Sequence, residues 1–140
     1  MSSKLKILFL CTGNSCRSQM AEGWALHLKG KVIEPYSAGI IAQGLNPRAV
    51  KVMKEIGIDI SLHSSKEIGS VRNISFDRVV TVCSKAEKSC PTFPGKTKVT
   101  HVYFDDPPSL AKFSKSEEEA LSYFRRVRDE IRIFIEKLSV

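Results

Sequence analysis

Long apolar segments are missing from this sequence of 140 residues. No apolar run approaches the roughly 18 residues that a membrane-spanning helix needs, so we expect no membrane span. The apolar stretch near the N-terminus, in MSSKLKILFLC, is not followed by the small-residue cleavage site of a secretory signal peptide. We therefore expect a cytoplasmic protein. Repeats, low-complexity tracts and linkers are also missing, and the length suits one compact domain over residues 1–140.

Signals for nucleic-acid binding are weak, although the formal net charge is +7. Residues 115–140 contain six basic and six acidic side chains, so the basic excess lies in residues 1–114. Basic residues are scattered there, without an aromatic stripe or a helix-turn-helix pattern. A solvated basic surface and the steering of a small anion both explain such an excess. We expect no nucleic-acid partner.

Cysteine is scarce, and the spacing of the four cysteines does not indicate a metal site. Structural disulfides are rare in a reducing cytosol, so these residues are buried thiols, metal ligands or reactive groups. The gaps of four residues between Cys11 and Cys16 and of six between Cys83 and Cys90 do not fit the shorter spacing usual for zinc. The three histidines are scattered, and none has an acidic partner at a spacing typical of catalysis. We expect no metal ligands.

Strand-like and helix-like patterns alternate along the chain. Strands are predicted over residues 4–10, 31–39, 76–83 and 98–104, and helices over residues 18–29, 47–56 and 116–138. Such alternation predicts a three-layer α/β sandwich, with a four-stranded parallel sheet and helices on both faces. Pro35 indicates an edge position for the second strand.

Polar side chains follow three of the predicted strands. Cys11 and Cys83 each end a strand or come directly after one, and Asp105 and Asp106 follow the last strand. Ligands of parallel sheets bind beyond the carboxyl ends of the strands. We therefore expect these residues to meet at one edge of the sheet.

The stretch CTGNSCRS, residues 11–18, has the composition of an oxyanion-binding loop between a strand and a helix. Backbone N–H groups and the helix start favour an anion there, and Arg17 can bind two of its oxygens. In that field the thiolate of Cys11 is favoured and becomes a nucleophile, with Ser18 placed to donate a hydrogen bond to the sulfur. Cys16 is expected to be structural. The predicted oxyanion-binding residues are Thr12, Gly13, Asn14, Ser15, Cys16 and Arg17.

The whole sequence is similar to a known family. CTGNSCRSQMAEGW resembles the signature of the low-molecular-weight tyrosine phosphatase fold, and within that fold the chain most resembles the thioredoxin-coupled arsenate reductases. Further motifs in the order of the family are YSAG, GLNPRAV, GIDIS, VVTVC, FDDP and FRRVRDEI. The resemblance implies reduction of arsenate to arsenite for arsenic detoxification by a monomer, with thioredoxin as the reductant and phosphate or sulfate as substrate analogues.

The resemblance also implies roles for an aspartate and two further cysteines. The general acid of the family is the aspartate before proline, which is Asp106 here, whereas DDPP taken alone reads as a plain turn. The family's relay runs from Cys11, the nucleophile, to Cys83 in a transient Cys11–Cys83 disulfide, and ends in a Cys83–Cys90 disulfide. The polar segment SKAEKS is expected to be a flexible loop that allows this exchange. Two inert buried thiols are the alternative.

A tightly bound cofactor is not expected. Some relatives bind potassium with residues that match Asn14, Glu22 and Ser37, but Lys66 stands where an aspartate of that cluster is expected. Its ammonium either takes the place of the cation or is simply exposed, so potassium is not assigned.

Two other functions remain open on the sequence. A phosphatase acting on phosphate monoesters would use the same loop, although DDPPSL lacks the aromatic residues that eukaryotic phosphatases carry after their Asp-Pro. A binding protein that senses oxyanions or redox state would bind the anion without turnover.

Overall fold

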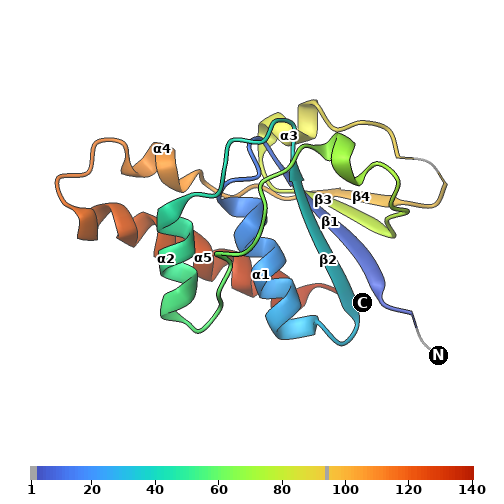
Figure 1. Cartoon of the computed structure of the whole chain (residues 1–140), viewed down its shortest axis with the longest axis horizontal. Helices are drawn as coiled ribbons and strands as arrows, with labels where there is room; N and C mark the ends of the chain where they lie inside the picture. Colours follow the sequence, from blue (N-terminus) through green and yellow to red (C-terminus); the bar gives the residue numbers. More distant parts are fainter. Residues whose placement is uncertain (1–2, 94) are drawn as a thin grey trace.

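Four parallel strands form the sheet at the centre of the structure, a computed structural model that describes residues 3–93 and 95–140. The strands are β1 (Leu5–Cys11), β2 (Ile33–Gly39), β3 (Arg78–Thr81) and β4 (Lys98–His101). Their order is β2-β1-β3-β4, and every neighbouring pair runs parallel (Figure 1). The predicted α/β fold with a four-stranded parallel sheet and packed helices is confirmed. β2, which contains Pro35, lies at an edge as predicted.

Six helical segments connect and cover the strands in the part of the chain that the structure describes. They are α1 (Arg17–Lys29), α2 (Pro47–Glu55), the 3-10 helix η1 (Ile68–Val71), α3 (Ser84–Lys88), α4 (Pro107–Ala111) and α5 (Glu117–Lys137). Among the described residues, no helix is both long and apolar enough to cross a membrane. The bounds of α1, α2 and α5 agree with the predicted helices to within one residue at each end.

The three short helices η1, α3 and α4 are not predicted by the sequence pattern. Most of the segment SKAEKS, expected to be a flexible loop, is the helix α3, so the expectation of a loop is wrong. Helices of four or five residues are too short to show the apolar repeat that identifies longer ones. Local signals mark the start of two of them: at α3 the Cys83 sulfur accepts the N–H of Ala86 at 3.4 Å, and Pro107 begins α4.

The C-terminal helix α5 packs against α1. Its start is fixed by Ser116, whose hydroxyl accepts the N–H of Glu119 at 3.0 Å. The indole N–H of Trp24 in α1 donates to the carbonyl oxygen of Arg128 in α5 at 3.0 Å. The buried apolar residues of α5 are Ala120, Leu121, Phe124, Val127, Ile131 and Ile135. This amphipathic face is core packing, as its spacing predicts.

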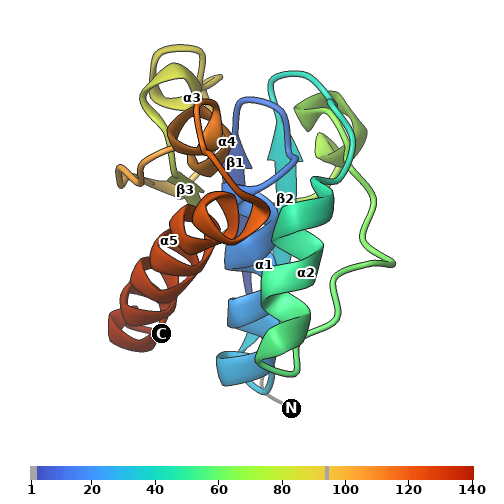
Figure 2. The same cartoon turned by 90° about the vertical axis from the view of Figure 1, so that its left-hand side faces the viewer.

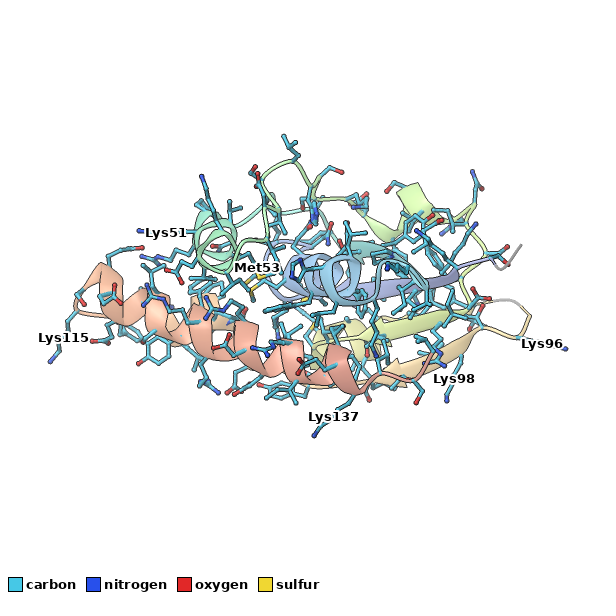
Figure 3. The ribbon with its side chains drawn as sticks, turned by 90° about the horizontal axis from the view of Figure 1, so that it is seen from below. Lys51, Met53, Lys96, Lys98, Lys115 and Lys137 are labelled. Atoms are coloured by element: carbon cyan, nitrogen blue, oxygen red, sulfur yellow. The ribbon has the colours of Figure 1, made fainter. Side chains whose placement is uncertain are left out.

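The helix α2 is held between α1 and α5. Met53 of α2 is fully buried, and its Cε lies 3.2 Å from the position that a Cβ on Gly23 of α1 would take. On the other side, the Arg128 guanidinium donates to the carbonyl oxygen of Val52 at 2.9 Å and lies 3.0 Å from a carboxylate oxygen of Glu55. Figure 3 shows Met53 inside the helical layer, whereas the labelled lysines at the periphery point outward.

The loop after β1, α3 and α4 gather at the carboxyl ends of the strands (Figure 2). Backbone bonds extend the sheet toward them: the N–H of Val82 donates to Leu10 at 2.9 Å, and the N–H of Phe104 donates to Val82 at 3.4 Å. These bonds bring Cys83 beside Cys11. The segments expected to carry chemistry therefore meet at one end of the sheet.

Candidate active site

The loop between β1 and α1 turns its carbonyl groups outward. They accept backbone N–H groups from the segment after β2, with N···O distances between 2.9 and 3.1 Å. These bonds run from Ile40 to Cys11, from Ile41 to Thr12, from Gln43 to Gly13 and from Asn46 to Ser15. The N–H groups of Gly13, Asn14, Ser15 and Cys16, in contrast, donate to no acceptor in residues 3–93 and 95–140. Unpaired N–H groups on one short loop form a cradle for an oxyanion.

Gly39, the last residue of β2, lets the loop approach the sheet closely. A Cβ at this position would lie 2.3 Å from the carbonyl oxygen of Ile41 and 2.6 Å from the backbone nitrogen of Asn14. Neither atom can move without breaking the backbone arrangement, so only glycine fits. The loop itself turns at Asn14, which has a φ of 49°.

The buried Asn14 side chain ties the loop to its surroundings. Its Nδ2 donates to Ser18 Oγ at 3.0 Å, and its Oδ1 accepts from Gln19 Nε2 at 3.0 Å and from the Lys66 N–H at 2.9 Å. The structure thus gives Ser18 a partner other than the predicted one. Among the described residues, no hydrogen bond joins Ser18 to Cys11. In this state Ser18 supports the loop rather than the sulfur.

Arg17 is buried and leaves one donor unpaired. Its Nη1 donates to the carbonyl oxygen of Phe104 at 2.9 Å, and its Nη2 lies 3.5 Å from Asp106 Oδ1. Its Nε is buried and has no hydrogen-bond partner among the described residues. An unpaired buried guanidinium N–H is costly unless a ligand accepts it. Arg17 therefore links the loop to the Asp-Pro segment and keeps a donor for an anion.

The two neighbouring aspartates are held differently. Asp106 accepts a hydrogen bond from the Ser109 hydroxyl at 2.7 Å and precedes Pro107 at the start of α4. The Asp105 carboxylate accepts from Arg126 Nη2 at 2.9 Å, and this bond lowers the pKa of Asp105 below its ordinary value. Asp106 lines the pocket over the loop, whereas Asp105 does not, so Asp106 is the better placed acid of the two.

Cys11 and Cys83 lie together although they are distant in the sequence. The Cys83 sulfur interacts with the Thr12 hydroxyl at 3.2 Å and with the Ala86 N–H at 3.4 Å. Its hydrogen bond with Cys11 is the main cause that lowers the pKa of Cys83 to about 5. The interaction with Cys83 is also the largest cause that raises the pKa of Cys11, and burial is the second. The charge of Arg17 acts in the opposite direction. The sequence predicts the thiolate at Cys11; in this arrangement the neighbouring thiols instead raise the pKa of Cys11 and lower that of Cys83.

Cys90 is not part of this pair. It is half-buried after the end of α3, its sulfur lies 3.6 Å from the carbonyl oxygen of Pro91, and burial raises the pKa of its thiol. Cys83 is the N-cap of α3 and Cys90 follows its C-cap, Ser89, so the helix separates the two cysteines. All four cysteines are free. The structure therefore brings Cys11 and Cys83 together and leaves Cys90 apart.

A cavity of about 330 Å³ opens over the loop. Its walls include Cys11 and Arg17, and also Gln43, Lys85 and Asp106. Gln43 and Lys85 are not predicted from the sequence. Gln43 belongs to a segment without any motif, and the only signal for Lys85 is that it follows Cys83 by two residues.

The residues that match the potassium cluster of some relatives bond to one another. Ser37 Oγ donates to Glu22 Oε1, and both acceptor positions of Asn14 Oδ1 are filled by N–H groups of Gln19 and Lys66. The Lys66 ammonium donates to a backbone carbonyl oxygen and forms no ion pair with Glu22 in the described part of the chain. These oxygens fit a closed hydrogen-bond network better than a potassium ion.

His63 has partners that sequence spacing does not reveal. Its Nδ1 lies 3.0 Å from Gln19 Oε1 and 3.7 Å from Glu22 Oε2. The acidic partner is distant in the sequence, which is why spacing alone misses it. These contacts lie behind the loop and support it.

Comparison with known proteins places this geometry in a family. The sequence profile described as low molecular weight phosphotyrosine protein phosphatase matches residues 6–139. The chain is 54% identical over 131 residues to an arsenate reductase of Bacillus subtilis (strain 168), a match that covers 94% of this chain and 91% of the relative.

Solved structures of similar proteins have the same fold. A structure of an arsenate reductase in the oxidized state superposes with a TM-score of 0.79 and 31% identity, covering 95% of each chain. A structure of an arsenate reductase in the phosphate binding state superposes with a TM-score of 0.70 and 29% identity, covering 96% of this chain and 99% of that chain. The similarity thus extends over nearly the whole chain.

Proposed function

The chain belongs to the low molecular weight phosphotyrosine protein phosphatase family and is an arsenate reductase of that family; we propose that it works through a relay of Cys11, Cys83 and Cys90. One observation carries the proposal: the Cys83 sulfur lies 3.2 Å from the hydroxyl of Thr12, the residue next to Cys11, beside a pocket lined by Cys11, Arg17 and the loop. A phosphatase needs one thiol at such a pocket. A reductase needs a second thiol within reach, because the first must be released as part of a disulfide.

Arsenate binds in the cradle of the loop. The unpaired N–H groups of Gly13, Asn14, Ser15 and Cys16 and the free Nε–H of Arg17 supply donors on one side of the pocket. Phosphate and sulfate have the same tetrahedral shape and compete for these donors. An arsenate reductase structure in the phosphate binding state supports this choice of ligand.

In the first step Cys11 attacks arsenic. The proton that Cys11 shares with Cys83 moves to Cys83, so Cys11 becomes the thiolate. A sulfur–arsenic bond forms and one arsenic–oxygen bond breaks, and Asp106 protonates the departing oxygen so that it leaves as water. Arg17, which lies 3.5 Å from Asp106, holds the acid beside the bound anion.

In the second step Cys83 attacks the sulfur of Cys11. The new disulfide forms as the sulfur–arsenic bond breaks, and the electron pair of that bond stays on arsenic, which is reduced from As(V) to As(III). The proton of Cys83 passes to the arsenite oxygens. Cys83 needs no large movement for this step because its sulfur already lies 3.2 Å from the hydroxyl of Thr12, the residue next to Cys11.

In the third step the Cys90 thiol loses its proton to solvent and attacks Cys83, a Cys83–Cys90 bond replaces the Cys11–Cys83 bond, and Cys11 leaves as a thiolate. The resulting Cys83–Cys90 disulfide requires α3 to unwind, since its helical form separates the two cysteines. Only Ala86 of α3 is buried, so unwinding exposes little apolar surface. A dithiol of the thioredoxin class then reduces the disulfide.

The relay needs no partner other than its reductant. The enzyme acts as a monomer in the cytoplasm, with thioredoxin as its partner and without a bound cofactor. Asn14, Glu22 and Ser37 serve the loop through hydrogen bonds, and no step uses potassium.

The proposal is tested with single-cysteine variants in a coupled assay. Thioredoxin, thioredoxin reductase and NADPH are mixed with the enzyme, and NADPH loss after arsenate addition is followed. Cys83→Ser is expected to abolish multiple turnover but to keep hydrolysis of an aryl phosphate, because the loop is unchanged. Cys90→Ser is expected to release one equivalent of arsenite and to stop as the Cys11–Cys83 disulfide.

Two results would contradict the relay. Multiple turnover of arsenate by Cys83→Ser would show that the second thiol is not needed, and a phosphatase would then be the better description of the site. Arsenite production without thioredoxin-dependent NADPH loss would point to another thiol donor.

A further inference from the structure

The helix that separates the two relay cysteines also forms one wall of the anion pocket. We infer that Lys85 of α3 is a substrate-binding residue and that it couples the charge of the bound oxyanion to the closed position of α3. The inference rests on the proposed relay, because it concerns the timing of its last step. It gives α3 a function beyond that of a spacer between Cys83 and Cys90.

Lys85 is a cation with no partner among the residues that the structure describes. Two cationic side chains line the pocket, Arg17 and Lys85. Arg17 already interacts with Phe104 and Asp106, whereas Lys85 forms no ion pair or side-chain hydrogen bond within residues 3–93 and 95–140. A free ammonium on the wall of an anion pocket is available to the anion.

The helix α3 is weakly attached where Lys85 lies. Its other side chains are exposed apart from Ala86. Its first turn is fixed by Cys83, the residue whose chemistry requires α3 to open. A contact between Lys85 and a bound anion would therefore supply a substantial part of the interaction energy that holds this helix in place.

That contact depends on the charge of the ligand. Arsenate is an anion near neutral pH and attracts the ammonium, whereas arsenous acid is uncharged and does not. Lys85 would thus hold α3 closed while substrate occupies the pocket and release it when product forms. Once Cys83 is bound to Cys90 in a disulfide, it can no longer attack Cys11. This disulfide would then form only after arsenic is reduced. The same contact protects the two thiols from premature oxidation.

The test measures how inorganic phosphate affects closure of the Cys83–Cys90 disulfide. The full chain with Cys11→Ser is treated with diamide, which takes two electrons and two protons from the thiols of Cys83 and Cys90 and becomes the hydrazine as their S–S bond forms. Peptide mass spectrometry follows this disulfide with and without phosphate. We expect phosphate to slow its formation roughly fivefold or more.

Three further substitutions in the Cys11→Ser chain isolate the ammonium. Lys85→Met should remove the phosphate effect, and Lys85→Arg should keep it. Lys88→Met is the matched control, because Lys88 lies on the same exposed helix but does not line the pocket. In the otherwise unmodified enzyme, Lys85→Met should raise KM for arsenate roughly fivefold without lowering kcat.

Equal protection by phosphate in the Lys85→Met and parent chains would overturn the inference, and so would no protection in any chain. Failure of the wild-type enzyme to form the Cys83–Cys90 disulfide during arsenate turnover would instead overturn the relay. In that case the phosphate Kd, measured by calorimetry, still tests whether Lys85 binds the anion. An unchanged Kd in Lys85→Met would exclude it from the pocket.

Discussion

The loop after β1 and the helix α3 meet at the same end of the sheet, but the protein holds them in opposite ways. The loop is buried, its carbonyl groups are bonded to the segment after β2, and Asn14 alone makes three side-chain hydrogen bonds within it and around it. α3 has one buried side chain and an exposed, charged surface. Yet the contact between the Thr12 hydroxyl and the Cys83 sulfur, at 3.2 Å, joins the two.

This difference matches the two tasks of the site. Binding and attack require donors fixed before the anion arrives, because any reorganisation of the loop would weaken the preorganised field. Disulfide exchange requires the attacking sulfur to reach several positions in turn. A fixed loop beside a loosely held helix meets both needs with few residues.

The largest expected effect comes from removing the nucleophile. Cys11→Ser should lower both arsenate reduction and aryl phosphate hydrolysis by roughly 10³-fold or more, because both begin with attack by this sulfur. Phosphate binding, measured by calorimetry, should persist because the loop donors remain. Loss of one activity alone would mean that the two reactions do not share a nucleophile.

The charge on the Cys11–Cys83 pair should appear in a pH titration. The pKa of Cys83 is lowered to about 5, so its thiolate is populated above that pH. Its alkylation by iodoacetamide, followed by mass spectrometry, should level off above about pH 6 and fall roughly tenfold per pH unit below about pH 5. Cys11→Ala should move the midpoint upward, because it removes the main cause of the lowered pKa. An unmoved midpoint would contradict the shared hydrogen bond.

The loop should depend strongly on one buried amide. Asn14→Ala leaves Ser18, Gln19 and the Lys66 N–H without their partner and should reduce the free energy of unfolding by about 2–3 kcal/mol, measured by urea titration. Asn73→Ala, at an exposed asparagine, is the control and should change it by less than about 0.5 kcal/mol. Equal effects of the two changes would remove the basis for calling the loop rigid.

The smallest expected effect comes from loosening α3. Ala86→Gly should weaken the helix by roughly 1 kcal/mol, with little change in the denaturant midpoint of the whole protein. The Cys83–Cys90 disulfide should form several-fold faster under diamide. A large drop in global stability would instead show that α3 is as firmly attached as the loop.

The features that could be predicted from the sequence are those encoded within a short window. The buried run of β1, the capped apolar stripe of α5 and the Cys11–Arg17 spacing each belong to one continuous stretch. α3 escapes prediction because a helix of five residues has no apolar repeat, although Pro107 offers a start signal for α4.

Properties that depend on tertiary contacts could not be predicted. The raised pKa of Cys11 follows from the proximity of Cys83, and the bond from Asn14 to Ser18 follows from the way the loop closes. The place of Lys85 on the pocket wall depends on where α3 lies against β1 and β3. No local pattern reports these distances.

The single buried side chain of α3 has an evolutionary consequence. A segment that commits only Ala86 to the core can accept substitutions at its other positions with little effect on folding. Natural variation can therefore change the exposed positions of α3 other than Lys85 without disturbing the catalytic loop. Across species, enzymes that share this loop are expected to diverge most between their two relay cysteines, each suited to the oxidants and anions of its own cell.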